Sequence, residues 1–363
     1  MQDQITHTAN KKSCANCGAA LAFKPGSTQL LCGYCGYEEF IEPSKTSFEE
    51  LELSHYLKVV GDNAFTNKID LIACKSCGAN QHIQESFKSL SCVFCSEPLI
   101  IEDAQKEGWI IPGAVLPFQL DKKQARQLFF KWIRSLWFAP NKLKKAALDP
   151  ERLHGLYVPF WTFDANLHAN YSGMRGDYYY ETRTVQTNKG TKTQQVRKTR
   201  WSSASGSVKG FIDDILVSAS SKRKNQLPKK IYGWDLKKLQ PFNQQFLNGF
   251  VTEKYTISLK EGHTASFKQA KQIAHRWIRQ DIGGDTQQIH QAAITLTDES
   301  FKHILLPVYV SSYRYKGKLY HFFINGENGK ITGDNPISYW KVFFAVLAGI
   351  IVIGGLFAVF GDN

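Results

Sequence analysis

The chain has 363 residues, of which 43% are hydrophobic and 21% charged, so it can bury the cores of two or three domains, and its composition excludes a polytopic membrane protein. The formal net charge of +13 is uneven: residues 1–110 contain 9 lysines, no arginine and 14 acidic residues, a net charge of −5 that leaves +18 for the remainder. An acidic partner, a phosphate polymer or an anionic membrane surface is therefore expected to meet residues 111–363 rather than the N-terminal segment.

All eight cysteines lie between Cys14 and Cys95 in two sets of the same design. Fourteen residues separate the two CxxC pairs of each set, and every cysteine of the second set follows its counterpart by 60 positions. The sets are Cys14, Cys17, Cys32 and Cys35, and Cys74, Cys77, Cys92 and Cys95. The pattern predicts a duplicated zinc ribbon: a first ribbon at 1–45, a linker at 46–72 and a second ribbon at 73–110.

The CxxC spacing explains why a metal is expected. Two thiolates two residues apart face one metal from a tight knuckle, and two knuckles complete a tetrahedral site of four sulfurs. Zinc is the usual occupant, so we expect two zinc ions; iron in a rubredoxin-like site and a redox-active CxxC pair are the alternatives. Four thiolates leave no open coordination position, which indicates a structural role.

Clustered CxxC pairs also suit a reducing compartment, and the polar residues 1–20 predict no signal peptide.

A second duplication, with an offset of 145 residues, follows the cysteines. Residues 123–134 match residues 268–279, and both copies end in Trp-Ile-Arg. Asp121 is a suitable N-cap for the first copy, and apolar residues recur with helical spacing in both copies. The apolar positions are Ala125, Leu128, Phe129, Trp132, Ile133, Leu136 and Trp137, and then Ala270, Ile273, Ala274, Trp277 and Ile278. We interpret these side chains as core rather than as a stacking platform for bases.

Each predicted helix leads to a similar strand, at 156–161 and at 305–309, with Pro159 and Pro307 placed where an edge or entry position would tolerate them. Asn325-Gly326 and Asn328-Gly329 predict turns after a hairpin strand at 318–324. The expected fold class is therefore α+β, with two zinc ribbons and a duplicated helix-plus-antiparallel-sheet body of two units, 111–170 and 263–338.

A basic insertion, residues 171–262, separates the two units. Residues 178–185 and 193–201 read as the strands of a polar hairpin that turns around 188–190. The candidate contacts with nucleic acid or lipid headgroups are Arg197, Lys198, Arg200, Lys222, Arg223 and Lys224. A solvated polar hairpin without a ligand is the alternative.

The C-terminal segment is strongly apolar. Residues 342–360 contain no charge, which predicts a transmembrane helix at 339–361 with Lys330 and Lys341 on its near side. The positive-inside rule then predicts a tail-anchored, single-pass protein of the inner (cytoplasmic) membrane with most of its chain in the cytoplasm. A buried C-terminal helix is the alternative.

The stretch Asp281-Ile-Gly-Gly-Asp285 is interpreted as a helix C-cap rather than as an acidic site.

Signatures of enzymes are not found in the sequence. It has no GxxxxGK[ST] phosphate loop, no HExxH and no GxSxG motif, and its ten histidines are scattered. These observations lower the expectation of an enzyme.

The cysteine sets, the 281–285 turn, the strands at 301–309 and 313–317 and the C-terminal apolar segment together resemble a family of uncharacterised prokaryotic tandem zinc-ribbon membrane proteins. Members are often labelled as relatives of the primosomal protein N′ (replication factor Y) helicase or as TFIIB-type zinc-ribbon proteins. The resemblance implies the domain plan and zinc at the eight cysteines, and it supplies no activity. The helicase label does not suit this chain, which lacks the motor.

We therefore expect a membrane-tethered, non-enzymatic adaptor or scaffold whose ribbons face a protein partner. Nucleic-acid binding by the basic body is the alternative, and an unrecognised enzyme with a pocket between the two units is a third hypothesis. No small-molecule substrate is evident from the sequence.

Overall fold

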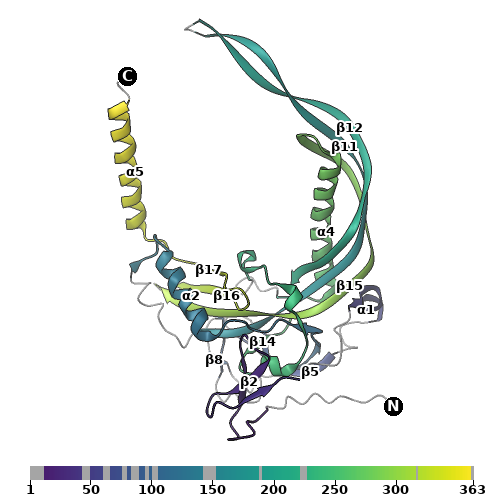
Figure 1. The fold of residues 1–363 in the computed structure, drawn as a ribbon, viewed down its shortest axis with the longest axis vertical. Coiled ribbons are helices and arrows are strands. Elements are labelled where there is room, and N and C mark those ends of the chain that lie inside the picture. The colour runs from purple at the N-terminus through teal and green to yellow at the C-terminus, as the bar shows by residue number, and fades with distance from the viewer. Residues whose placement is uncertain are drawn as a thin grey trace.

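The computed structural model describes residues 12–42, 50–59, 66–75, 80–82, 90–94, 98–99, 105–141, 153–187, 190–220, 227–315 and 318–360. One 12-stranded sheet dominates these residues, with a separate three-stranded sheet at the N-terminal end and a two-stranded sheet formed by β7 and β8. Figure 1 shows a base from which two projections rise, a curved arm and the C-terminal helix.

The small sheets and the base contain mostly short strands. The bounds are β1 Leu21–Lys24, β2 Gln29–Cys32, β3 Glu38–Phe40, β4 Leu51–Glu52, β5 Thr66–Ala73, β6 Asn80–His82, β7 Leu90–Ser91, β8 Pro98–Leu99, β9 Gln105–Ile110, β10 Ala114–Val115, β13 Gln240–Pro241, β14 Val251–Glu253, β16 Lys318–Asn325 and β17 Ile331–Gly333. The helices are α1 Leu53–Val59, α2 Lys122–Ser135, α4 Leu259–Ile282 and α5 Tyr339–Phe360, with 3₁₀ turns at Lys229–Ile231, Leu236–Lys238 and Gln244–Leu247.

Three very long strands form the arm, which we define as residues 165–187, 190–212 and 259–298. They are β11 (His154–Thr187), β12 (Gly190–Ser218) and β15 (Thr286–Tyr315), with β11 paired to both of the others. Helix α4 lies along the concave side of these strands (Figure 1), and its buried residues join a core cluster with Trp161 and Leu167. Since β15 begins opposite Gly176, residues 177–187 and 190–200 continue as a two-stranded tip. Eleven strand residues carry this tip about 36 Å beyond the third strand.

The strands of the two repeat copies pair with each other. Residues 154–164 of β11 lie antiparallel to residues 300–310 of β15, with Pro159 opposite Leu305 and Pro307 opposite Tyr157. Both prolines therefore lie inside the large sheet, and the prediction of edge or entry positions is wrong. On its other side β11 pairs with β14 up to Tyr157 and with β12 from Phe160. Likewise β15 pairs with β10 up to Leu305 and with β16 from Val308. Each proline thus falls where the neighbouring strand changes, so its missing N–H interrupts no ladder.

The two repeat helices form where their caps and periodicity predict. Asp121 and Gln124 form a capping box at the start of α2, and Ser258 and Glu261 form one at the start of α4. The buried residues are Ala125, Phe129 and Ile133 on α2 and, on α4, Ala270, Ala274, Ile278 and Ile282 among others. Trp137 is the exception, because α2 ends before it and its side chain is 76% exposed. Gly283, with φ of 67°, caps α4 through its amide and the Arg279 carbonyl, as expected.

The predicted α+β body of two helix-plus-sheet units is wrong. The described chain is mostly sheet, and the strands of both repeat copies belong to one sheet rather than to two hairpin units. The predicted hairpin of the insertion does form, but its strands are continuations of β11 and β12 rather than a separate element. Pairing between the copies buries more apolar strand surface than two isolated hairpins would.

The transmembrane helix, the tail anchor and the single-pass inner-membrane localisation are also wrong. Among the described residues, no helix has both the length and the apolar character that crossing a membrane requires.

Candidate metal centre

The first cysteine set lies on the three-stranded sheet, whose order is β1-β2-β3. Leu21 pairs with Cys32 at one end of the β1–β2 ladder, and Lys24 pairs with Gln29 at the other. Alternating burial along these strands places Leu21, Phe23 and Leu30 inside the ribbon. The hairpin thereby brings the first knuckle, just before β1, next to the second knuckle, which begins at the end of β2.

Two knuckles of the same backbone geometry present the sulfurs. The Gly18 amide donates to the Cys14 carbonyl at 2.8 Å, and the Gly36 amide donates to the Cys32 carbonyl at 3.0 Å. Gly18 and Gly36 have φ of 73° and 75°, a left-handed conformation in which a side chain would be strained. The glycine that follows each CxxC pair therefore closes the turn that points both thiols inward.

The four sulfurs converge on one point. The Sγ atoms of Cys14 and Cys35 are 3.5 Å apart, as are those of Cys17 and Cys32, and all four Sγ atoms lie within 4.8 Å of one another. A tetrahedral site with Zn–S bonds of 2.3 Å has sulfurs about 3.8 Å apart. The donor set and its spacing therefore fit a zinc ion.

Backbone amides favour the thiolate form of the second knuckle. The Tyr37 amide lowers the pKa of Cys35 to about 6, and the amides of Cys35 and Tyr34 lower the pKa of Cys32. At Cys17 the Ala19 amide acts in the same direction, but burial and the hydrogen bonds with the other three thiols raise its pKa to about 12. A cation at the centre of the four sulfurs would favour the thiolate form of all of them.

The ribbon is fixed to the body of the protein. The Phe23 ring meets that of Phe246 edge-on at 5.4 Å, and the Phe23 amide donates to the Asn248 carbonyl at 3.0 Å. On the neighbouring turn the Gly26 amide donates to the Phe118 carbonyl at 2.8 Å. Because residues from the ribbon and the base share one core cluster, the metal centre is held rigidly against the large sheet.

The second cysteine set is described in part. Cys74 directly follows β5 and Cys92 directly follows β7; both are buried in a core cluster beneath the large sheet. The Gln81 side chain donates to Cys92 Sγ at 3.3 Å and accepts from the Val93 amide at 3.4 Å. Cys77 and Cys95 lie outside the described residues. In contrast to the first set, Cys74 follows a strand of the large sheet, whereas Cys92 follows a strand of the two-stranded sheet.

The candidate basic residues on the hairpin do not share one face. Arg197 lies over the Tyr178 ring at 4.3 Å and faces one side of the two-stranded tip. Lys198 and Arg200 face the other side because side chains alternate along a strand. Lys198 pairs there with Glu181, and Arg200 lies 5.4 Å from the centre of a tyrosine ring. Lys222, Arg223 and Lys224 lie outside the described residues.

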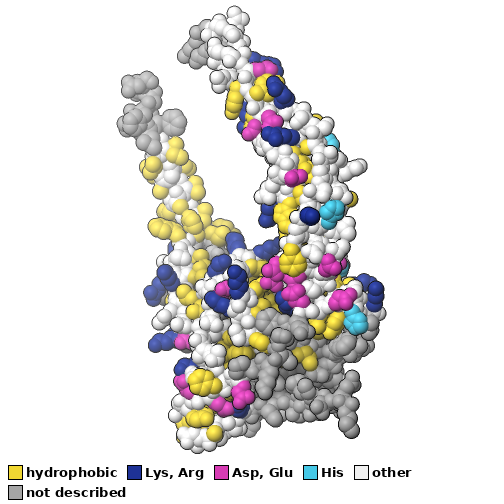
Figure 2. Space-filling model, turned by 45° about the vertical axis from the view of Figure 1, so that its right-hand side comes forward, with side chains coloured by type: hydrophobic (Ala, Val, Ile, Leu, Met, Phe, Trp, Pro, Cys, Tyr) yellow, Lys and Arg dark blue, Asp and Glu magenta, His cyan; other side chains and the backbone are white. Residues whose placement is uncertain are grey.

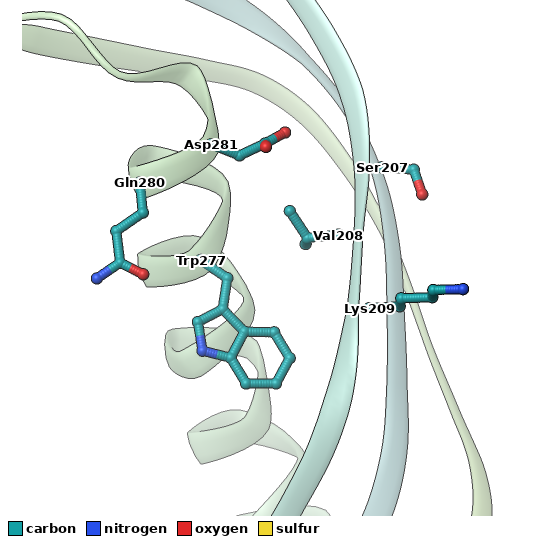
Figure 3. Close-up of a pocket in the computed structure, with 6 residues that line it drawn as sticks. All are labelled: Ser207, Val208, Lys209, Trp277, Gln280 and Asp281. Atoms are coloured by element: carbon teal, nitrogen blue, oxygen red, sulfur yellow. The ribbon is translucent and has the colours of Figure 1, made fainter.

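An open pocket lies between α4 and β12 rather than between the two repeat units. Figure 3 shows Trp277 and Asp281 of α4 facing Val208, while Ser207 and Lys209 point away from the helix. Asp281 Oδ2 accepts a hydrogen bond from the Tyr171 hydroxyl at 2.5 Å. The polar groups around this pocket therefore do not converge on a common point.

Three exposed aromatic residues of the first ribbon escaped the sequence analysis. Tyr34 lies inside the second knuckle and is 86% exposed, Phe40 of β3 is 70% exposed, and Tyr37 between them is 37% exposed. The signal was present, since Cys32-Gly-Tyr-Cys35 places an aromatic residue where the knuckle turns outward. Its exposure depends on which side of the ribbon contacts the body.

Comparisons with known proteins identify one distant relative. The chain is 28% identical over 253 residues to the uncharacterized protein YdjG of Bacillus subtilis (strain 168), a match that covers 67% of this chain and 69% of the relative. No family model matches the chain, and no solved structure is similar to it.

Proposed function

We propose that this protein is a non-enzymatic zinc-ribbon adaptor that binds a protein partner through the exposed side of its first ribbon. The observation that carries the proposal is the position of Tyr34 and Phe40, two large aromatic side chains exposed on a rigid, cross-linked ribbon. Exposed aromatic residues on a preformed surface are typical anchors of protein interfaces, because they bury a large area at a small cost in conformational entropy.

The charge of the ribbon supports a protein partner over a phosphate polymer. Two of its lysines are already paired with acidic neighbours: Lys12 with Glu39, and Lys24 with Glu38 at 2.6 Å. The aromatic side is therefore flanked by compensated ion pairs rather than by free positive charge.

The metal of the proposed adaptor is zinc, with one ion at Cys14, Cys17, Cys32 and Cys35 and a second at Cys74, Cys77, Cys92 and Cys95. The equal spacing of the two sets and the burial of Cys74 and Cys92 support the second ion. Metal analysis of the purified full chain should give two zinc ions per chain, and a Cys35→Ser variant should give one. Iron in place of zinc, or no loss in the variant, would contradict this assignment.

The adaptor role is tested by copurification of the full-length chain from its native host. Replacing Tyr34 and Phe40 together with alanine should remove the bound partner without changing the zinc content, since both side chains are exposed and neither belongs to the cysteine cluster. Phe211→Ala is the matched control, because Phe211 is 58% exposed on β12, away from the ribbon. A partner retained equally by the double variant and the control would contradict binding through the ribbon.

Nucleic-acid binding by the basic residues of the tip has weaker support. Arg197 is separated from Lys198 and Arg200 by the thickness of the strand pair, and Lys198 is already paired with Glu181. If this alternative holds, the full chain binds DNA or RNA with an affinity that falls steeply with salt, and reversing the charge of all three residues weakens it. The adaptor proposal predicts no such binding at low salt.

A further inference from the structure

Two β-bulges meet at the base of the arm, on either side of Asp164. In the ladder between β11 and β12, Phe163 pairs with Ile215 and Ala165 pairs with Ile212, so Asp213 and Asp214 both lie opposite Asp164. A second bulge lies on β15, where the register shifts between Asp164 and Asn166. Bulges of this kind redirect side chains, and here the β12 bulge brings three carboxylates together.

The three carboxylates are close enough to share one ion. One carboxylate oxygen from each of Asp164, Asp213 and Asp214 lies within 4.8 Å of the others. Two calcium–oxygen bonds of about 2.4 Å span the same length. Asp164 is buried, Asp214 is partly buried and Asp213 is exposed, so the cluster opens to water on one side. Figure 2 shows acidic side chains gathered where the arm leaves the base.

Asp164 provides an independent sign of a ligand. Its side chain is 1% exposed, and its Oδ1 accepts a hydrogen bond from the Asp214 amide at 2.5 Å. Its Oδ2 is fully buried and accepts no hydrogen bond from any described residue, and the same holds for Oδ1 of Asp214. Buried carboxylate oxygens without a donor are costly unless a proton or a cation satisfies them.

The nearby ammonium compensates only part of this charge. Lys302 Nζ lies 3.9 Å from Asp164 Oδ2, beyond hydrogen-bonding distance, and 2.8 Å from Glu50 Oε1. The one positive charge of Lys302 is therefore shared between Glu50 and a group of three aspartates. Four carboxylates around one ammonium leave an excess of negative charge, which a divalent cation would compensate.

We propose that Asp164, Asp213 and Asp214 form a divalent-cation site of the calcium class, with water completing the coordination on the side of Asp213. Hard oxygen ligands from carboxylates suit this ion, and a partly open shell suits its need for six to eight ligands. The ion would pin the bulge of β12 to β11 where the long strands enter the arm. The inference is independent of the adaptor proposal, because it concerns a different part of the molecule.

The test is calorimetric titration of the full-length, zinc-loaded protein with calcium chloride. We expect one saturable site per chain, and we expect Asp164→Asn and Asp213→Asn each to weaken binding at least tenfold. Asp298→Asn is the matched control. Asp298 lies in the other bulge and has a positive φ, as Asp214 does, but its carboxylate accepts a hydrogen bond from the Asn166 side chain. Its replacement should therefore leave calcium binding unchanged.

Two features of the design distinguish a loss of folding from a loss of calcium binding. The zinc content of each variant reports whether the ribbons are intact, and Asp213→Asn replaces an exposed side chain with one of nearly the same size. No saturable calcium binding by the wild-type chain would overturn the proposal. Equal binding by wild type and both aspartate variants, or binding of magnesium with none of calcium, would overturn it as well.

Discussion

At the scale of single residues, the two polar centres of the molecule differ in how their negative charge is satisfied. Three cysteines of the first ribbon, Cys17, Cys32 and Cys35, receive hydrogen bonds from backbone N–H groups in or next to their own knuckles. Asp164 receives one amide, from Asp214, and its second oxygen has no donor among the described residues. The ribbon is therefore built for thiolates, whereas the bulge holds a carboxylate that burial disfavours.

The titration of Asp164 gives a signed pH dependence. Burial raises the pKa of Asp164 to about 6, above its usual value of 3.8, so the folded chain holds a proton that the unfolded chain releases. The free energy of unfolding should fall as the pH rises from about 4 to about 6, by roughly 2 kcal/mol in calcium-free buffer. Asp164→Asn has no such group and should not show this loss.

Denaturant unfolding of the wild type and of Asp164→Asn across this pH range gives the difference between their free energies of unfolding. Any loss of zinc at acid pH affects wild type and variant alike and cancels in that difference. Stability curves that run parallel from pH 4 to pH 6.5 would contradict the buried, uncompensated carboxylate.

The sequence reveals one of these centres and conceals the other for a physical reason. A CxxC knuckle is local, so the residues at 14–18 and 32–36 already specify its turn and its ligands. The aspartate cluster joins positions 50 residues apart, and its geometry depends on a one-residue shift of register. Composition and spacing carry no record of such a bulge.

At the scale of elements, the helices are more predictable than the strands. Capping boxes at Asp121 and Ser258 and an apolar face with helical period define α2 and α4 within their own segments. The extent of β11 and β15 is not local information, because polar residues of the arm stay in strand form only while a neighbour pairs with them. Pro159 and Pro307 suggested the starts of strands, yet each lies inside a strand, at the point where one neighbouring strand ends and the next begins.

Helix α4 packs against the base of the arm through a glycine. A Cβ on Gly262 would lie 2.7 Å from Cδ1 of Trp161, whose side chain is fully buried. Helix propensity alone favours alanine at this position by about 1 kcal/mol. We expect Gly262→Ala nevertheless to destabilise the protein by about 1–2 kcal/mol, because the crowded tryptophan cannot move into free space.

The comparison variant for this prediction is Thr264→Ala, which replaces an exposed residue of the same helix turn. It should change the free energy of unfolding by less than about 0.5 kcal/mol. Chemical denaturation followed by tryptophan fluorescence compares the two variants. A Gly262→Ala variant as stable as wild type would show that α4 does not approach Trp161 this closely.

At the scale of the whole molecule, the ribbon, the large sheet and the arm form one body. The first ribbon shares a core cluster with α2 and the base, and Cys74 and Cys92 of the second set lie in the cluster beneath the same sheet. This arrangement was not predictable, because β14 and β6 join segments that are far apart in the chain. The sequence suggested separate ribbons on a linker, since its repeats are arranged as separate units.

The rigid attachment explains how a small ribbon can present a defined surface. With Phe23 packed against Phe246 on one side, Tyr34 and Phe40 remain exposed at the outer end of the base. A partner that binds there meets a preformed surface and loses little free energy to ordering it.

Site-specific photocrosslinking in the native host tests this account most directly. A benzoylphenylalanine residue at position 34 should yield one discrete adduct with a single protein, while the same residue at position 211, which is also exposed, should yield none. The adduct should disappear when Cys35→Ser removes the metal from the ribbon. No adduct at position 34, or the same adduct at position 211, would contradict the proposal that the first ribbon is the docking surface of an adaptor.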